Sequence, residues 1–219
     1  MKLKAVDFLA AFIVAIPFLY WMQFKDSVND VIPVHWNIHG EPDGWESKED
    51  MPVLLSTFGG IGLILYVVLR FLKKIDPKRT AELTERTGEK VGIGMLMLLS
   101  ALAVLILWAP ANGYETTRGV YLILSIFFAF LGNIMYNVKP NYFIGLRLPW
   151  TLESEDNWKH THRLAGILWF CGGLGCALLS LFLKPSTMAP LFFIVSISLL
   201  LVPCGYSFFL FKRSKNQSL

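Results

Sequence analysis

The chain has 219 residues, of which 54% are hydrophobic and only 16% are charged, and its mean hydropathy is +0.52. A soluble core of this length would need charge on every helix, whereas here the charges form a few blocks between long apolar runs. The composition therefore excludes an ordinary soluble globular protein and indicates a membrane protein. The net charge of +4 does not predict a nucleic-acid partner, because in a membrane protein the position of basic residues matters more than their sum.

Six segments are long and apolar enough to cross a bilayer as helices. A span needs about 20 mostly apolar residues, and strands with open edges are too costly in lipid. We therefore predict an all-α integral membrane bundle of about six transmembrane helices. The predicted spans run approximately over Ala5–Phe24, Met51–Leu72, Val91–Pro110, Gly119–Tyr136, Leu164–Leu183 and Pro190–Phe211.

The distribution of Lys and Arg predicts the orientation. If the N-terminus is cytoplasmic, 16 of these residues lie inside and 4 lie outside. The positive-inside rule then places both termini in the cytoplasm of a cell (inner) membrane protein. We predict two membrane halves, residues 1–110 with an outer motif loop at 25–50 and residues 111–219 with an inner motif loop at 137–163.

The first span is followed by a polar, turn-rich and aromatic stretch, Ile32–Lys48. Its prolines fix φ, Gly40 and Gly44 permit a positive φ, and Asn37 can bond its own backbone, so we predict a shaped loop rather than a helix or a linker. Such a loop presents side chains outward. The candidate ligand-facing residues are His35, Trp36, Asn37, Gly40, Glu41, Pro42, Asp43, Trp45 and Lys48.

A zinc site is one alternative for this loop, because His35 and His39 lie close to Glu41 and Asp43. The familiar metalloprotease arrangement needs two His one helical turn apart, and the surrounding prolines and glycines disfavour a helix. We predict no metal and no cofactor, although metal binding by His35 and His39 stays open. The sequence also lacks nucleophile-elbow, Walker and dinucleotide motifs, which disfavours an enzyme.

Small residues mark the second and fifth spans. Gly59, Gly60 and Gly62 lie in the second, and Gly172, Gly173 and Gly175 lie in the fifth, so we expect these two helices to be central. Asp7 lies one turn from the cytoplasmic start of the first span, where it can reach the interface. After the second span, Pro77 is expected to begin a short helix.

The inner loop, Asn137–Arg163, is the second informative stretch. Its prolines interrupt a helix, and an acidic turn followed by basic residues predicts a helix that runs directly into the fifth span. Arg147 could hold a lipid phosphate or a partner carboxylate, or serve only as a positive-inside anchor. The candidate residues of this loop are Asn141, Gly145, Arg147, Pro149, Trp150, Thr151, Trp158, His162 and Arg163.

Two motifs give the chain a family resemblance. Pro-x-His-Trp-Asn at 33–37, followed by Gly-Glu-Pro-Asp-Gly-Trp at 40–45, resembles the start of the bacterial SdpI family of multi-pass membrane proteins. The second motif, Pro-Asn at 140–141 with Gly145, Arg147 and Pro-Trp-Thr-Leu at 149–152, and then Trp-Lys-His-Thr-His-Arg at 158–163, resembles the second half of that family. The motifs occur in the family's order and cover most of the chain.

This resemblance implies a membrane immunity protein that protects its cell from a secreted peptide toxin. It further implies a transcriptional repressor held at the membrane when toxin is bound. The outer loop would then face the toxin, and the inner loop would be a signalling or structural element. The expected partners are the lipid bilayer, a peptide toxin outside and a repressor inside, with no direct nucleic-acid contact and an open oligomeric state. The alternatives are a small transporter or lipid-binding membrane protein without a toxin and, less favoured, a membrane metalloenzyme.

Overall fold

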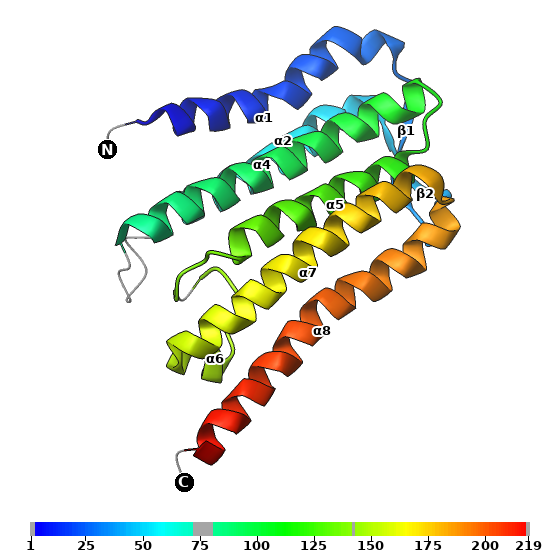
Figure 1. Ribbon diagram of the computed structural model, residues 1–219. Coiled ribbons are helices and arrows are strands. Elements are labelled where there is room, and N and C mark those ends of the chain that lie inside the picture. The colour runs from blue at the N-terminus through cyan, green and yellow to red at the C-terminus, as the bar shows by residue number, and fades with distance from the viewer. Residues whose placement is uncertain (1–2, 72–80, 142, 218–219) are drawn as a thin grey trace.

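Six long helices run back and forth between two ends of the molecule in the computed structural model, which describes residues 3–71, 81–141 and 143–217. All six are long and apolar enough to cross a membrane, which confirms the predicted all-α membrane bundle. Both termini lie at one end and a small sheet lies at the other (Figure 1). The helices are α1 (Ala5–Phe24), α2 (Met51–Arg70), α4 (Ala81–Ala111), α5 (Thr116–Met135), α7 (Glu155–Phe182) and α8 (Pro185–Gln217).

Several helices extend beyond their predicted apolar cores. Helix α4 begins ten residues before the predicted Val91, and α7 begins at Glu155, as the charge pattern of the inner loop predicted. These extra turns carry charged side chains, which a hydropathy window does not count although they continue the same helix. Pro77 lies outside the described residues.

Two short elements prepare the start of α7. Helix α6 (Pro149–Glu153) has Pro149 in its first turn, where the missing N–H of proline costs nothing. The hydroxyl of Ser154 then accepts a hydrogen bond from the Asn157 backbone nitrogen at 3.2 Å and caps α7. Pro149 therefore starts a helix rather than only ending one.

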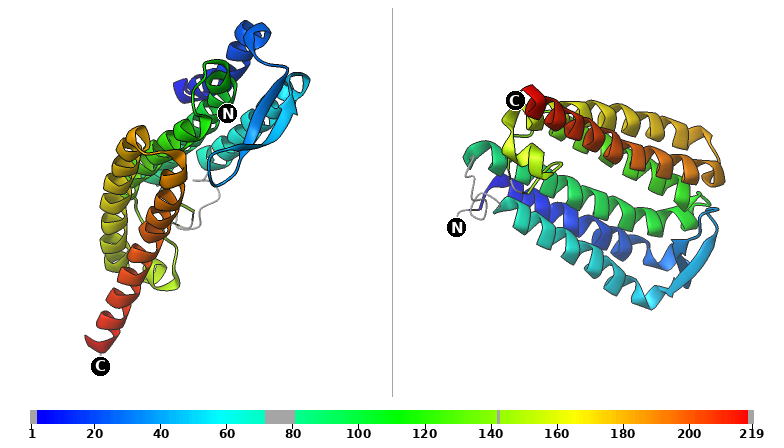
Figure 2. Two further views of the ribbon diagram at one scale, coloured as in Figure 1. Left: turned by 90° about the vertical axis from the view of Figure 1, so that its right-hand side faces the viewer. Right: turned by 90° about the horizontal axis from the view of Figure 1, so that it is seen from below.

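The outer motif loop contains a β-hairpin that the sequence analysis did not predict. Strand β1 (Val31–Trp36) pairs antiparallel with β2 (Pro42–Ser47), with irregular register around His35. A proline inside β1 made a strand unattractive from sequence. A two-stranded sheet has only edge strands, however, so a missing donor is tolerated there. The hairpin lies across the outer end of the bundle (Figures 1 and 2).

Helix α4 occupies the centre of the first half. It contacts α1, α2 and α5. Of the residues in its apolar, membrane-spanning stretch, 44% are buried, against 17% for α2. The expectation that α2 is central was therefore wrong. Its glycines instead allow a close approach to single neighbours, since a Cβ on Gly62 would lie 2.8 Å from a methyl carbon of Leu96.

In the second half, α5 and α7 pack backbone to backbone. A Cβ at Gly173 would lie 2.5 Å from the backbone nitrogen of Ala129 and 2.6 Å from the carbonyl oxygen of Ser125. Farther along, a Cβ at Gly132 would lie 2.8 Å from the carbonyl oxygen of Gly166. Small residues at such positions let transmembrane helices approach closely, so the contact depends on the absence of side chains.

Replacing one of these glycines should force the two helices apart. We expect Gly173→Ala to cost about 1–3 kcal/mol of stability, because the added methyl group meets backbone that cannot rotate away. The midpoint of thermal unfolding, measured by tryptophan fluorescence of the purified protein in detergent, would report the loss. Gly175→Ala is the matched control, since its Cβ would meet no heavy atom of the described residues within 4 Å. Equal midpoints for the two variants would contradict the close contact.

Candidate functional site

The tip of the hairpin is shaped by Asn37. Its side-chain oxygen accepts hydrogen bonds from the backbone nitrogens of His39 (2.9 Å) and Glu41 (3.1 Å), and its amide donates to the Glu41 carboxylate at 3.0 Å. Gly40 follows with a φ of +84°, which strongly favours glycine. Asn37, Gly40 and Glu41 therefore define the turn at the tip of the hairpin.

Gly40 also joins the hairpin to the second half of the molecule. A Cβ at this position would lie 2.7 Å from the Pro185 Cβ and 3.1 Å from the Thr117 hydroxyl. Pro185 begins α8, and Thr117 lies in the first turn of α5. The tip of the hairpin thus rests on the outer ends of two helices that follow it in sequence by more than 70 residues.

The base of the hairpin is anchored in the first half. Ile32 is buried in an apolar cluster with Val28, Met51 and Leu107, and Trp36 packs against the same cluster. Lys48 donates to the Val28 carbonyl oxygen at 3.3 Å. Trp36 and Lys48 therefore hold the hairpin in place.

Several candidate residues have exposed side chains, among them Glu41 at the turn and His35, Asp43 and Trp45 on the strands. The His35 Nδ1 and Asp43 Oδ1 atoms are 2.6 Å apart across the strands, and these side chains are 73% and 44% exposed. Trp45 is 56% exposed. Pro42 is also exposed, at the start of β2. Trp45 lies two residues after Asp43 on β2, so the same hairpin carries an aromatic ring for apolar contact and a His–Asp pair for hydrogen bonds to a peptide.

Metal ligation has little support in this arrangement. Among the described residues, no three His, Cys, Asp or Glu side chains gather closely enough to hold a metal ion. His35 and Asp43 form a pair with each other across the strands.

In the inner loop, Asn141 shapes the chain much as Asn37 does outside. Its side-chain oxygen accepts from the backbone nitrogens of Phe143 (2.8 Å) and Ile144 (2.6 Å), and its amide donates to the carbonyl oxygens of Lys139 and Ile144. The Asn141 side chain is 2% exposed. All of its hydrogen-bonding atoms are directed at backbone, which makes it a structural residue.

His162 is the buried centre of the inner loop. Its Nδ1 donates to the Trp158 carbonyl oxygen at 2.8 Å, and its Nε2 accepts from the Leu146 backbone nitrogen at 2.9 Å. The carbonyl can only accept and the N–H can only donate, which fixes this tautomer. The Trp158 ring stacks on His162 with centroids 3.9 Å apart, and Gly145, with a φ of +124°, passes directly beside the imidazole.

The α6 segment is tied down by its own side chains. The Thr151 hydroxyl accepts from the Leu148 backbone nitrogen at 2.9 Å. The Trp150 indole donates to the Ser207 hydroxyl of α8 at 2.9 Å and packs against Phe208. Trp150 and Thr151 therefore dock α6 on the helix bundle.

Arg147 and Arg163 are exposed at the cytoplasmic end. The guanidinium of Arg163 lies over the Tyr136 ring, with its carbon 5.7 Å from the ring centroid. Exposed arginines can contact phosphates or carboxylates outside the protein. Among the inner candidates these two offer the clearest charged surface.

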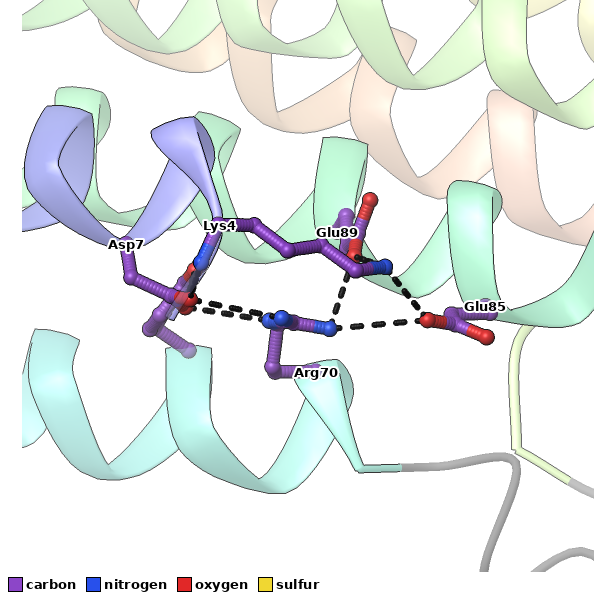
Figure 3. A network of polar contacts seen from close by, with 6 residues as sticks. Lys4, Asp7, Arg70, Glu85 and Glu89 are labelled. Atoms are coloured by element: carbon purple, nitrogen blue, oxygen red, sulfur yellow. Dashed lines mark hydrogen bonds and ion pairs between the residues drawn. The ribbon is translucent and has the colours of Figure 1, made fainter. Parts of the chain in front are cut away.

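A charged network at the inner end of the first half was missed from sequence. Arg70 donates to Asp7 (Nε to Oδ1, 3.0 Å) and to Glu89 (Nη1 to Oε1, 2.8 Å), while Lys4 bonds Glu85 at 2.6 Å and Glu89 at 3.0 Å (Figure 3). The network joins α1, α2 and α4. The sequence feature that could have predicted the network is the pair of opposite charges, Asp7 and Arg70, at neighbouring ends of the first two spans.

The network gives Asp7, which the sequence placed near the interface, specific partners within the protein. The Tyr66 hydroxyl also donates to Asp7 at 2.6 Å, and Arg70 is only 7% exposed. Lys4 lies just before the first membrane-spanning segment. Its hydrogen bonds to Glu85 and Glu89 raise the pKa of the Lys4 ammonium group above its ordinary value. Asp7 thus accepts hydrogen bonds from Tyr66 and Arg70 of α2 and from the Lys4 backbone nitrogen.

Both motif loops fall within matches to known protein families. A family model described as the SdpI/YfhL protein family matches residues 137–207, and one described as a domain of unknown function (DUF1648) matches residues 12–55. The chain is also 29% identical over 180 residues to a protein of Bacillus subtilis (strain 168) named immunity protein SdpI. That alignment covers 80% of this chain and 82% of the relative. No solved structure matches the chain.

Removing the buried imidazole should leave an unpaired donor. We expect His162→Phe to lower stability by about 1–3 kcal/mol, because the Leu146 N–H loses its acceptor while the ring volume is kept. Thermal unfolding in detergent would measure the loss, and His160→Phe, at an exposed position of the same helix, is the control. Equal stability of the two variants would show that the Leu146 bond contributes nothing.

Breaking the charged network should cost more when only one partner is removed. We expect Arg70→Met to cost about 2–4 kcal/mol, since Asp7 is left largely buried without its cation. The double variant Asp7→Asn/Arg70→Met should recover part of this loss. A double-mutant cycle of unfolding free energies would measure the coupling, and strictly additive losses would contradict a direct interaction.

Proposed function

Because this chain belongs to the SdpI family of multi-pass membrane proteins, we propose that it is an immunity protein of the cell membrane. On this proposal it protects its cell from a secreted peptide toxin that meets the outer hairpin. The proposal includes a site, the surface formed by His35, Asp43 and Trp45. The similar Bacillus subtilis protein is named an immunity protein, which supports the general role. The toxin-facing site is our own assignment.

One observation carries the choice of site. His35, Asp43 and Trp45 are exposed, yet the hairpin that bears them is anchored by Ile32 at its base and by Gly40 at its tip. Preorganised exposed groups bind with a smaller loss of conformational entropy than mobile ones. The arrangement therefore favours recognition of an external ligand.

For the inner loop we propose a mainly structural role. Asn141, Thr151, Trp158 and His162 are buried and satisfied by contacts within the loop and its neighbouring helices. If a cytoplasmic repressor is captured, the exposed Arg147 and Arg163 are the residues on which its binding would depend. The same division assigns ligand contact to the half formed by residues 1–110 and cytoplasmic contact to the half formed by residues 111–219.

A transporter is less well supported. The hollow between α1, α4 and α5 is lined by apolar side chains, and the one hydroxyl in its lining, on Ser100, donates to the Ile13 carbonyl oxygen at 3.0 Å. A polar solute crossing the membrane needs polar partners along its path. This hollow does not provide them.

Survival of toxin-sensitive cells tests the proposal. We expect cells expressing the protein to survive at least one of a panel of membrane-active peptide toxins. His35→Ala/Asp43→Ala and Trp45→Ala should each reduce protection about tenfold or more at equal membrane abundance, because tenfold corresponds to about 1.4 kcal/mol and a central interface residue costs about 2 kcal/mol or more when truncated. Lys184→Ala, an exposed change at the same end of the molecule, is the control.

Two results would separate the role from the site. Protection that survives in both hairpin variants would contradict the hairpin as the toxin-facing surface while leaving immunity in place. A lack of protection against every peptide would overturn immunity itself. Arg147→Ala, at the opposite end, should leave protection unchanged if its role is cytoplasmic.

A further inference from the structure

Side chains of α1, α4 and α5 line a furrow that runs along α4, the hollow described above. In Figure 1, α1 and α5 lie on either side of α4. Its larger part has a volume of about 700 Å³. The lining is apolar apart from Ser100, whose hydroxyl is already bonded to backbone. Representative lining residues are Leu9, Phe12 and Ile16 of α1, Met97 and Val104 of α4, and Ile123 of α5.

The cytoplasmic continuation of this furrow has a different chemistry. A second hollow of about 380 Å³ shares Met97 with the first and is lined by Arg86, Glu89 and Lys90 together with apolar side chains. Along α4 the lining residues recur every three or four positions, so they form one face of the helix. From Arg86 to Trp108 this face is about 33 Å long at about 1.5 Å per residue, close to the thickness of the hydrocarbon core.

The charges at the cytoplasmic end favour an anion. Glu89, the acidic residue of the lining, is already bonded to Arg70 and Lys4. Arg86 and Lys90 are both exposed and lie one helical turn apart. The furrow therefore combines an apolar trough at membrane depth with two basic side chains at the level of the cytoplasmic headgroups.

We propose that this furrow binds an anionic phospholipid of the cytoplasmic leaflet. The headgroup phosphate contacts Arg86 and Lys90, and an acyl chain lies along Ile93 and Met97 toward Ser100. Ten residues of helix rise about 15 Å, which is half of the hydrocarbon thickness and matches the distance from Lys90 to Ser100. The site lies on the opposite side of the membrane from the hairpin, and the inference does not rest on toxin immunity.

The charge pattern is what favours a lipid over a second copy of the chain. A purely apolar face could be covered by any apolar helix. Here two basic residues at the cytoplasmic end match the phosphate of a phospholipid, and the apolar part of the furrow matches its tails. Each basic residue near a membrane surface contributes about five- to sixfold to the binding of anionic lipid, so two contribute about thirtyfold.

Native mass spectrometry of the detergent-purified full chain can test this, with dioleoylphosphatidylglycerol and dioleoylphosphatidylcholine as the two probes. We expect the wild type to bind phosphatidylglycerol about thirtyfold more tightly than phosphatidylcholine. Arg86→Gln/Lys90→Gln should remove most of this preference. Lys159→Gln/Arg213→Gln, which removes the same charge from exposed cytoplasmic positions of the other half, should keep it.

A second pair of variants tests the acyl groove. Met97→Trp fills the furrow where its two parts meet and should weaken binding of both lipids, whereas Leu201→Trp, at a 61% exposed position on α8, should not. Three results would overturn the proposal. They are equal binding of both lipids by the wild type, an equal loss of preference in the two charge variants, and a dimer that Met97→Trp dissociates, which would assign the furrow to a second copy.

Discussion

The hydrocarbon core of a bilayer offers no hydrogen-bonding partners, and a polar group buried within the protein has the same need for an internal partner. Near the two ends of the bundle the protein meets this need with side chains that bond one another or the backbone. Asn141 bonds four backbone groups, His162 uses both ring nitrogens, and Arg70 bridges carboxylates from two helices. The irregular segments are possible only because these partners are supplied internally.

The two halves of the molecule meet this constraint in different ways. In the first, ion pairs between Arg70, Asp7 and Glu89 tie three helix ends together. In the second, the backbones of α5 and α7 are in direct contact, and buried neutral groups such as Asn157, which donates to the Ser207 carbonyl oxygen at 2.9 Å, fix the remaining helix. Charge therefore organises one half and close packing organises the other.

Most of the fold could be predicted from sequence because hydropathy over 20 residues is a strong signal. The six spans and the start of α7 followed from apolar length and from the acidic first turn. The hairpin could not be predicted in the same way, since Pro33 and the short strands hide its alternation and its stability comes from contacts of Ile32 and Gly40 with distant helices. Tertiary contacts of this kind leave no local pattern.

The candidate sites show the same division. Sequence identified the motif residues, but it could not separate those that build the site from those that face outward. Asn37 and Asn141 have the same role in two loops, but the sequence predicted backbone bonding for Asn37 alone. The Asp7–Arg70 pair was missed because its members are 63 residues apart and belong to helices whose neighbour relation is not encoded locally.

The contact between the hairpin tip and the start of α8 has a mechanical consequence. Gly40 rests on Pro185, the first residue of a helix of 33 residues that ends at the opposite face of the membrane. A displacement of the tip would therefore act first on the outer end of α8, the helix whose opposite end carries Lys212 and Arg213.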